Sequence, residues 1–149
     1  NMIDDKVVDL DITEIEPGTV ASLVWQVEVQ EITSFAELSG DRNPLHVDGE
    51  YARSVGYKGE VAHGMLLGAK FSGLFGMRLP GKRCLLLEQN LSYPNPVYAG
   101  DQIALKVEVR DVHSELGIVE LKATAERLSD SGKPGPQVAR GKVICKILS

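Results

Sequence analysis

The residues best suited to acid–base chemistry lie in a short polar stretch, Phe35 to Asp48, with the sequence FAELSGDRNPLHVD. It contains a carboxylate at Asp41 and an imidazole at His46. Such a pair facing one cavity can hold a water molecule, because one group takes a proton from the water and the other gives a proton to a substrate. The spacing alone leaves a second interpretation open, in which Asp41 forms a turn and His46 is a partly buried loop residue.

The same stretch predicts a rigid loop that would bring the two side chains together. Gly40 suits the end of a helix, because glycine tolerates the left-handed backbone that other residues avoid. We expect Asn43-Pro44 to prevent a resumed helix, since proline has no N–H and pushes the residue before it to extended geometry. Leu45 should anchor the loop in the core, and Asn43 should brace it through its amide group.

The apolar stretch 61–79, VAHGMLLGAKFSGLFGMRL, predicts a long helix that begins at Gly64. It has no polar face, which is typical of a buried helix, and at about 15 residues it is too short to span a membrane. Its glycines weaken it by up to about 1 kcal/mol each, so we expect close packing against its backbone. Gly64 opens this helix, where the first-turn N–H groups have no partner within the helix and carry the positive end of its dipole.

Strands and short helices account for most of the remaining chain. Alternating apolar and polar residues predict a half-buried strand within 19–30, and later strands are predicted at 84–91, 102–112, 117–128 and 137–148. Short helices are expected at 33–38 and 48–55. One long helix followed by antiparallel strands indicates the α+β class, and the absence of repeats or a linker in the sequence indicates a single domain, residues 1–149.

The composition is that of an ordinary globular protein, with 149 residues, 43% of them hydrophobic and 25% charged. A net charge of -5 without a Lys/Arg run argues against a nucleic-acid partner, because neutralising phosphates needs a basic face. The sequence has no apolar run of membrane-spanning length, so we expect no membrane partner. Cys84 and Cys145 form no motif and lie in separate apolar runs, which favours buried free thiols in a reducing, cytoplasmic location.

The string S-G-D-x-N-P-L-H-x-D, from Ser39 to Asp48, resembles the signature of the MaoC-like family of (R)-specific enoyl-CoA hydratases, also called hydratase 2. The segments HGMLL, FSGLFG, LPGK and NPVYAGD extend the resemblance over almost the whole chain from about residue 18. It implies a hot-dog fold, in which a curled antiparallel sheet surrounds a central buried helix. It also implies a hydro-lyase of fatty acid metabolism, which catalyses reversible syn hydration of trans-2-enoyl thioesters to (R)-3-hydroxyacyl thioesters.

Residue roles follow from this resemblance. Asp41 and His46 correspond to the family's acid–base pair, and the Gly64 N–H corresponds to the donor that stabilises the charged thioester oxygen. Ser72 corresponds to a further member of the same polar site. From the residues alone, Gly64 could instead be a packing glycine and Ser72 could bond to a helix carbonyl. The candidate substrate-binding residues, most of them on the wall of an acyl tunnel, are Asn43, Leu66, Leu67 and Phe71.

His63 precedes Gly64, and we expect it to be a structural hydrogen bonder rather than a catalytic group. A metal site made from His46, Asp48 and His63 matches no known ligand spacing, so no metal is expected. No cofactor is expected either, because the thioester itself makes C2 acidic.

The substrate is expected to be a thioester of CoA or of an acyl carrier protein. Candidate phosphate contacts are Lys58, Lys82 and Arg83. We expect a homodimer or a dimer of dimers, because one curled sheet covers only about half of the long helix. Two alternatives to a hydratase remain open at this point: a hot-dog acyl-CoA thioesterase, and a non-catalytic module that binds acyl thioesters.

Overall fold

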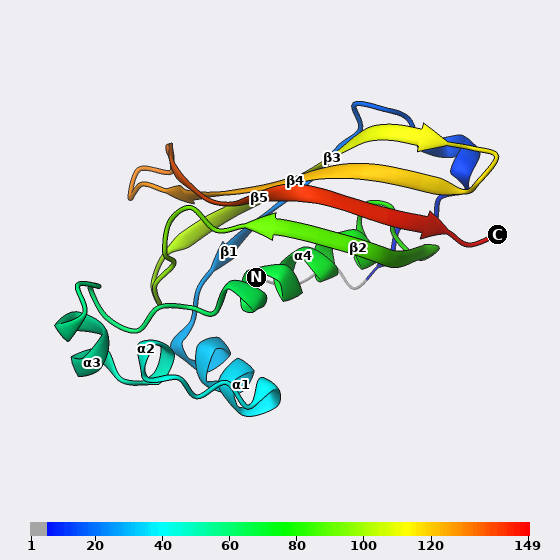
Figure 1. The fold of residues 1–149 in the computed structure, drawn as a ribbon. Helices are drawn as coiled ribbons and strands as arrows, with labels where there is room; N and C mark the ends of the chain where they lie inside the picture. Colours follow the sequence, from blue (N-terminus) through cyan, green and yellow to red (C-terminus); the bar gives the residue numbers. More distant parts are fainter. Residues whose placement is uncertain (1–5) are drawn as a thin grey trace.

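Five strands, each with an apolar face, form one antiparallel sheet in the order β1-β3-β4-β5-β2 (Figure 1). The computed structural model describes residues 6–149. The strands are β1 Val20–Gln26, β2 Cys84–Ser92, β3 Gln102–His113, β4 Ile118–Leu128 and β5 Pro134–Ile147. All five expected strands are confirmed, although β5 begins before residue 137, where it was predicted to start. The sheet lies over helix α4, Gly64–Met77, which is the hot-dog arrangement.

The core lies between α4 and the inner face of the sheet. Residues of β3 and β4 alternate between this buried face and the outside, as the sequence predicted. The buried side chains of these two strands are Ile103, Leu105, Val107, Val109, Val119, Leu121, Ala123 and Ala125. The α4 side chains in the same core are Leu66, Leu67, Phe71, Leu74 and Phe75. Burial of this apolar surface is the main force that holds the helix against the sheet.

The other side of α4 is exposed in a single chain, which agrees with the expectation that one curled sheet covers only about half of this helix. Met65 is 70% exposed, and Ala69, Ser72 and Gly73 are exposed along the same helix. The reason is geometric, since one sheet can cover only one side of a helix. The apolar segment Leu85 to Leu87 on the edge strand β2 is also exposed.

Three short helices lie together beyond the N-terminal end of α4 (Figure 1). They are α1 Val29–Ser39, α2 Pro44–Val47 and α3 Gly49–Ser54. The first strand ends earlier than expected and α1 begins earlier, because Glu28 and Glu31 form a capping box that starts the helix. Val29 is therefore 61% exposed in the first turn of α1, not buried in a strand.

The prediction that Asn43-Pro44 would prevent a helix is also wrong. Pro44 is the first residue of α2, a position where its missing N–H is not needed and its fixed φ suits the helix. The Asn43 side-chain oxygen accepts a hydrogen bond from Leu45 N–H at 3.0 Å, so Asn43 does brace this segment. Gly40 adopts the left-handed conformation with φ 78°, as expected.

Cys84 and Cys145 are free, as expected, and lie on the neighbouring strands β2 and β5. A hydrogen bond between their side chains lowers the pKa of the Cys84 thiol. The same bond, together with burial, raises the pKa of the Cys145 thiol. Within residues 6–149, no helix is both long enough and apolar enough to cross a membrane.

Candidate active site

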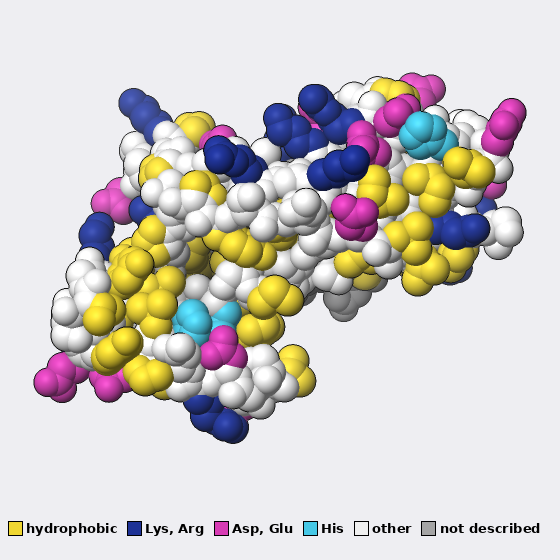
Figure 2. All heavy atoms as spheres, viewed as in Figure 1, with side chains coloured by type: hydrophobic (Ala, Val, Ile, Leu, Met, Phe, Trp, Pro, Cys, Tyr) yellow, Lys and Arg dark blue, Asp and Glu magenta, His cyan; other side chains and the backbone are white. Residues whose placement is uncertain are grey.

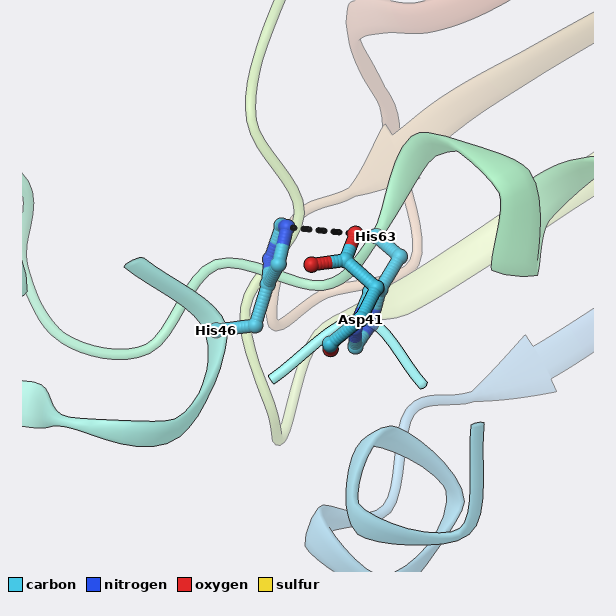
Figure 3. Close-up of side chains that lie close together, drawn as sticks. All are labelled: Asp41, His46 and His63. Carbon is cyan, nitrogen blue, oxygen red and sulfur yellow. Dashed lines mark hydrogen bonds and ion pairs between the residues drawn. The ribbon is translucent and has the colours of Figure 1, made fainter. Parts of the chain in front are cut away.

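The carboxylate of Asp41 and the imidazole of His46 face each other at the N-terminal end of α4 (Figure 3). The distance from His46 Nε2 to Asp41 Oδ2 is 3.7 Å, which confirms the predicted proximity of the two groups. The His46 side chain is 14% exposed and that of Asp41 is 49% exposed. The pair therefore combines a largely covered imidazole with a carboxylate that solvent can reach.

The second ring nitrogen of His46 determines what its first nitrogen can do. His46 Nδ1 lies 2.6 Å from the Val61 carbonyl oxygen, which can only accept a hydrogen bond, so Nδ1 carries the proton. In the neutral ring, Nε2 then presents a lone pair toward Asp41. At 3.7 Å the two atoms are too far apart for a direct hydrogen bond. Two facing acceptors at this separation suit a molecule that donates to both, such as water.

Asp41 is held by local bonds and by one distant one. Its N–H donates to Ser39 Oγ at 3.1 Å, and Asn43 N–H donates to its Oδ1 at 3.2 Å. The distant bond comes from His63 Nε2, which lies 3.0 Å from the Asp41 main-chain oxygen. The expectation that His63 is a structural hydrogen bonder is thus confirmed. None of these hydrogen bonds engages the Oδ2 atom that faces His46, so this atom can exchange a proton with a bound molecule.

A pocket of about 320 Å³ joins His46 to Gly64, the first residue of α4. In Figure 2, a histidine on this end of the molecule lies among hydrophobic side chains and next to an acidic one. The other residues that line the pocket are Leu45, Tyr57, Val61, Ala62, Leu67, Tyr93, Pro94, Asn95, Pro96, Val97 and Val138. The pocket is mainly apolar, and the start of a helix provides N–H donors at its wall.

Both sequence-based interpretations of Gly64 agree with its position. A side chain here would place a Cβ only 3.0 Å from the Tyr93 ring, so the residue must be small for packing reasons. The same lack of a side chain leaves the backbone open to the pocket. Its role as the donor to a thioester oxygen remains a prediction.

Sequence reasoning missed Tyr93, whose ring covers Gly64 and lines the pocket. Burial raises the pKa of the Tyr93 hydroxyl above its usual value. The available signal was an aromatic residue directly before Pro94 at the expected end of a strand. Tyr57 and Val138 were missed as well, and Val138 reaches the pocket from the distant strand β5.

The other predicted site residues occupy different positions. Leu67 lines the pocket, whereas Leu66 and Phe71 are buried in the core, 6% and 0% exposed, and are not among the residues lining it. Ser72 lies on the exposed side of α4, about 12 Å along the helix from Gly64. The structure of one chain therefore does not bring Ser72 to Asp41 and His46.

The candidate phosphate contacts are divided between the two ends of α4. Lys58 borders a second pocket, of about 360 Å³, together with Tyr98 and Arg127. Lys82 and Arg83 follow the C-terminal end of α4, about 21 Å from Gly64. Arg83 is paired there with acidic residues of the N-terminal segment. Of the three, Lys58 alone lies at the end of α4 that carries the acid–base pair.

Asp41, His46 and His63 offer ligand atoms within 4.8 Å of one another. The two imidazole rings are stacked, with centroids 3.8 Å apart and an angle of 22° between their planes. Their nitrogen lone pairs therefore lie in two nearly parallel, separate planes, so both cannot point directly at one tetrahedral ion. His63 Nε2 is also engaged by Asp41 O, and Asp48 instead caps α3. These residues fit a metal ion poorly.

A five-stranded antiparallel sheet curled over one helix, with a carboxylate–imidazole pair at the start of that helix, places the protein in the hot-dog class. A family model described as "MaoC like domain" matches residues 12–129. The chain therefore belongs to the MaoC-like family.

Individual relatives agree with this assignment. The chain is 40% identical over 133 residues to an (R)-specific enoyl-CoA hydratase of Aeromonas caviae, covering 89% of this chain and 96% of that protein. It is 32% identical over 111 residues to a 3-hydroxybutyryl-CoA dehydratase of Methylorubrum extorquens, covering 74% and 71%. A solved structure titled as an (R)-hydratase from A. caviae involved in PHA biosynthesis matches with a TM-score of 0.81 at 34% identity, covering 89% of this chain and 97% of that one.

Proposed function

We propose that the protein is an (R)-specific enoyl-CoA hydratase, a hydro-lyase that adds water reversibly to trans-2-enoyl thioesters. The observation that carries this proposal is the facing pair of acceptors, Asp41 Oδ2 and His46 Nε2, of which His46 lines the same pocket as Gly64 in the first turn of α4. Relatives named as hydratases and as a 3-hydroxybutyryl-CoA dehydratase support the same reaction in its two directions.

The reaction begins when the water oxygen forms a bond to C3 of the enoyl thioester. The C2=C3 π electrons move toward C1, and the carbonyl oxygen gains negative charge, which the Gly64 N–H stabilises. The Asp41–His46 pair accepts a proton from the attacking water and then passes a proton to C2. The pair thus ends with as many protons as it held at the start. Because the two groups are 3.7 Å apart, both additions occur on one face of the substrate, which is a syn addition.

We propose that no cofactor takes part, since the thioester itself stabilises the charge that develops next to C2. The substrate is a thioester of CoA or of an acyl carrier protein, and its acyl end lies against Leu67 in the pocket. A cytoplasmic location is proposed as well. The free state of Cys84 and Cys145, despite their close approach, supports a reducing compartment.

A homodimer, or a dimer of dimers, is proposed from the exposed apolar surface. Met65 on α4 and the segment Leu85 to Leu87 on the edge strand β2 are unusual surface residues for a monomer. A second copy would cover them, and it would also give Ser72 a partner surface. Sedimentation at micromolar concentration should show a dimer or a tetramer, and a stable monomer would contradict this.

The activity is tested by incubating the purified protein with trans-2-enoyl-CoAs of increasing chain length. We expect the absorbance of the conjugated double bond to fall and the product to be the (R)-3-hydroxyacyl-CoA, as determined by chiral chromatography. A thiol assay in parallel with saturated acyl-CoA separates hydration from hydrolysis. Release of free CoA without hydration would indicate the thioesterase alternative, and binding without turnover would indicate a non-catalytic module.

A further inference from the structure

We propose that His63 is a positioning residue that holds both members of the acid–base pair through two different contacts of one ring. This inference rests on the proposed hydratase function. The His63 side chain is buried, so it does not touch the substrate itself. Two of its contacts are with Asp41 and His46, the residues drawn beside it in Figure 3.

The burial of His63 is not explained by stability. It is 2% exposed and is the one polar side chain among the buried residues that the structure describes. Its Nδ1 atom has no hydrogen-bond partner within residues 6–149. A buried polar atom without a partner is unfavourable for folding, and an apolar side chain of similar size would avoid that penalty. The ring is therefore better explained by what it contacts.

The contact with Asp41 fixes the backbone of the loop. The other hydrogen bonds that involve Asp41 come from residues two positions away. The bond from His63 Nε2 to the Asp41 carbonyl oxygen spans 22 residues and joins the loop to the start of α4. Without it, local bonds shape the loop but do not set its distance from the helix.

The contact with His46 fixes the imidazole. The two rings are stacked at 3.8 Å, and the Phe35 ring of α1 contacts His63 as well, at 4.8 Å and 60°. Stacking restricts the tilt of the His46 ring, and the bond from its Nδ1 to Val61 O restricts its rotation. The acid–base pair is thereby attached to residues 61–63, directly before Gly64. This arrangement fixes the position of Asp41 and His46 relative to the N–H groups in the first turn of α4.

Two substitutions separate the two contacts. His63→Phe keeps an aromatic ring for stacking and removes the hydrogen bond to Asp41 O, whereas His63→Gln keeps an N–H donor at a similar reach and removes the ring. Misplacement of reacting groups by about 1 Å can reduce turnover by about 100-fold. We expect kcat to fall by about 10- to 100-fold in each variant and by more in His63→Ala, with KM nearly unchanged.

The melting temperature distinguishes positioning from folding. His63→Phe should melt close to the unchanged protein, because the loss of the hydrogen bond to Asp41 O is offset by removal of a buried polar atom without a partner. His113→Phe is the matched control, since His113 is exposed on β3 and pairs with Asp111. That variant should leave kcat and KM unchanged. A well-folded His63→Phe protein with normal kcat would overturn the proposal, as would a loss that follows the folded fraction in all three His63 variants.

A spectroscopic measurement keeps this test independent of the proposed activity. The chain has three histidines, so ¹⁵N spectra of labelled imidazoles are simple to assign. His46 should show a single Nδ1–H form in the unchanged protein and a mixture of ring forms in His63→Ala. If the unchanged protein has no hydratase activity, the proposed function fails, and this spectrum still tests the positioning. An identical His46 spectrum in His63→Ala would contradict the positioning even in an active enzyme.

Discussion

At its C-terminal end α4 is closed by the chain itself, whereas its N-terminal end faces the pocket. Beyond Met77, Gly81 N–H donates to Phe75 O, and Val8 N–H donates to the Met77 carbonyl. At the other end, the His63 side chain does not cap the helix, and the first turn meets the pocket through Gly64. The comparison shows that one helix can serve as a fixed support at one end and as a binding element at the other.

The charged residues follow the same division. Near the C-terminal end, Arg83 is bonded to Asp9 and Asp11 at 2.9 and 3.2 Å, which attaches the N-terminal segment. Near the N-terminal end, the charged and titratable groups Asp41 and His46 are separated by 3.7 Å and are not bonded directly. Satisfied polar groups stabilise structure, and groups without a direct partner are available for chemistry. Substitutions at the two ends should therefore affect different measurements.

The largest effect is expected for Asp41→Asn at the N-terminal end. Asparagine keeps the shape of aspartate and its oxygen can still accept from Asn43 N–H, so the loop should persist. It cannot take up a proton, so turnover of a short trans-2-enoyl-CoA should fall by about 10²–10⁴-fold. His46→Gln should behave similarly. The test measures the hydration rate and the melting temperature of each variant. An active, well-folded Asp41→Asn protein would contradict the mechanism.

The next effect compares two glycines, Gly64 at the first position of α4 and Gly81 beyond its last residue. At Gly81, φ is 94° and a Cβ would lie 2.2 Å from Val8 O, so Gly81→Ala should lower the free energy of unfolding by about 2–5 kcal/mol. Activity per folded molecule should be kept. Gly64→Ala should change stability by only about 1 kcal/mol, since alanine favours the helix while its Cβ crowds Tyr93. Its turnover should fall by about 10-fold or more. If Gly81→Ala and Gly64→Ala lost equal activity per folded molecule, the two ends of α4 would not differ in function as described.

A third prediction compares two neighbouring leucines in the first turns of α4, Leu66 and Leu67. Both are buried, so truncation to alanine should cost each variant about 2–4 kcal/mol of stability. Leu67 lines the pocket and Leu66 does not. Leu67→Ala should therefore shift the preferred acyl chain toward longer substrates, and Leu66→Ala should keep the original profile. Relative kcat/KM values over a series of chain lengths are the measurement, and an unchanged profile in Leu67→Ala would exclude it from the acyl wall.

The smallest effect concerns Glu31, which joins α1 to the middle of α4. Its carboxylate accepts from Trp25 Nε1 at 2.9 Å and pairs with Lys70. Partial burial alone would raise the pKa of Glu31, but hydrogen bonds from Lys70, Trp25 and the Glu28 N–H lower it below the usual 4.5. A lowered pKa in the folded state means that the contribution to stability is present above about pH 4.5 and is lost as the pH falls.

Glu31→Gln should therefore lower the melting temperature slightly at neutral pH. The difference from the unchanged protein should shrink as the pH falls below about 4.5, because the original carboxylate then becomes protonated as well. Thermal melts across this range are the measurement. A difference that grows toward acid pH would show that the carboxylate does not stabilise the contact between α1 and α4.

Much of the local structure is determined by the sequence alone. Alternation of apolar residues located the strands, and capping residues such as Asp48 located a short helix. The stretch that carries Asp41 and His46 brought these groups together because both lie within a few residues of one turn. The Asn43-Pro44 prediction failed because the same proline can prevent a helix or begin one, and the cap bond from Asn43 decides between the two.

Only the tertiary structure decided which distant residues meet the acid–base pair. The order of the strands and the path of the chain bring Tyr93 over Gly64, stack His63 on His46, and leave Ser72 on the exposed side of α4. The same path places Lys82 and Arg83 at the far end of the helix. Periodicity and turn chemistry fix how a segment folds locally, but contacts between segments depend on their packing, which no local pattern specifies.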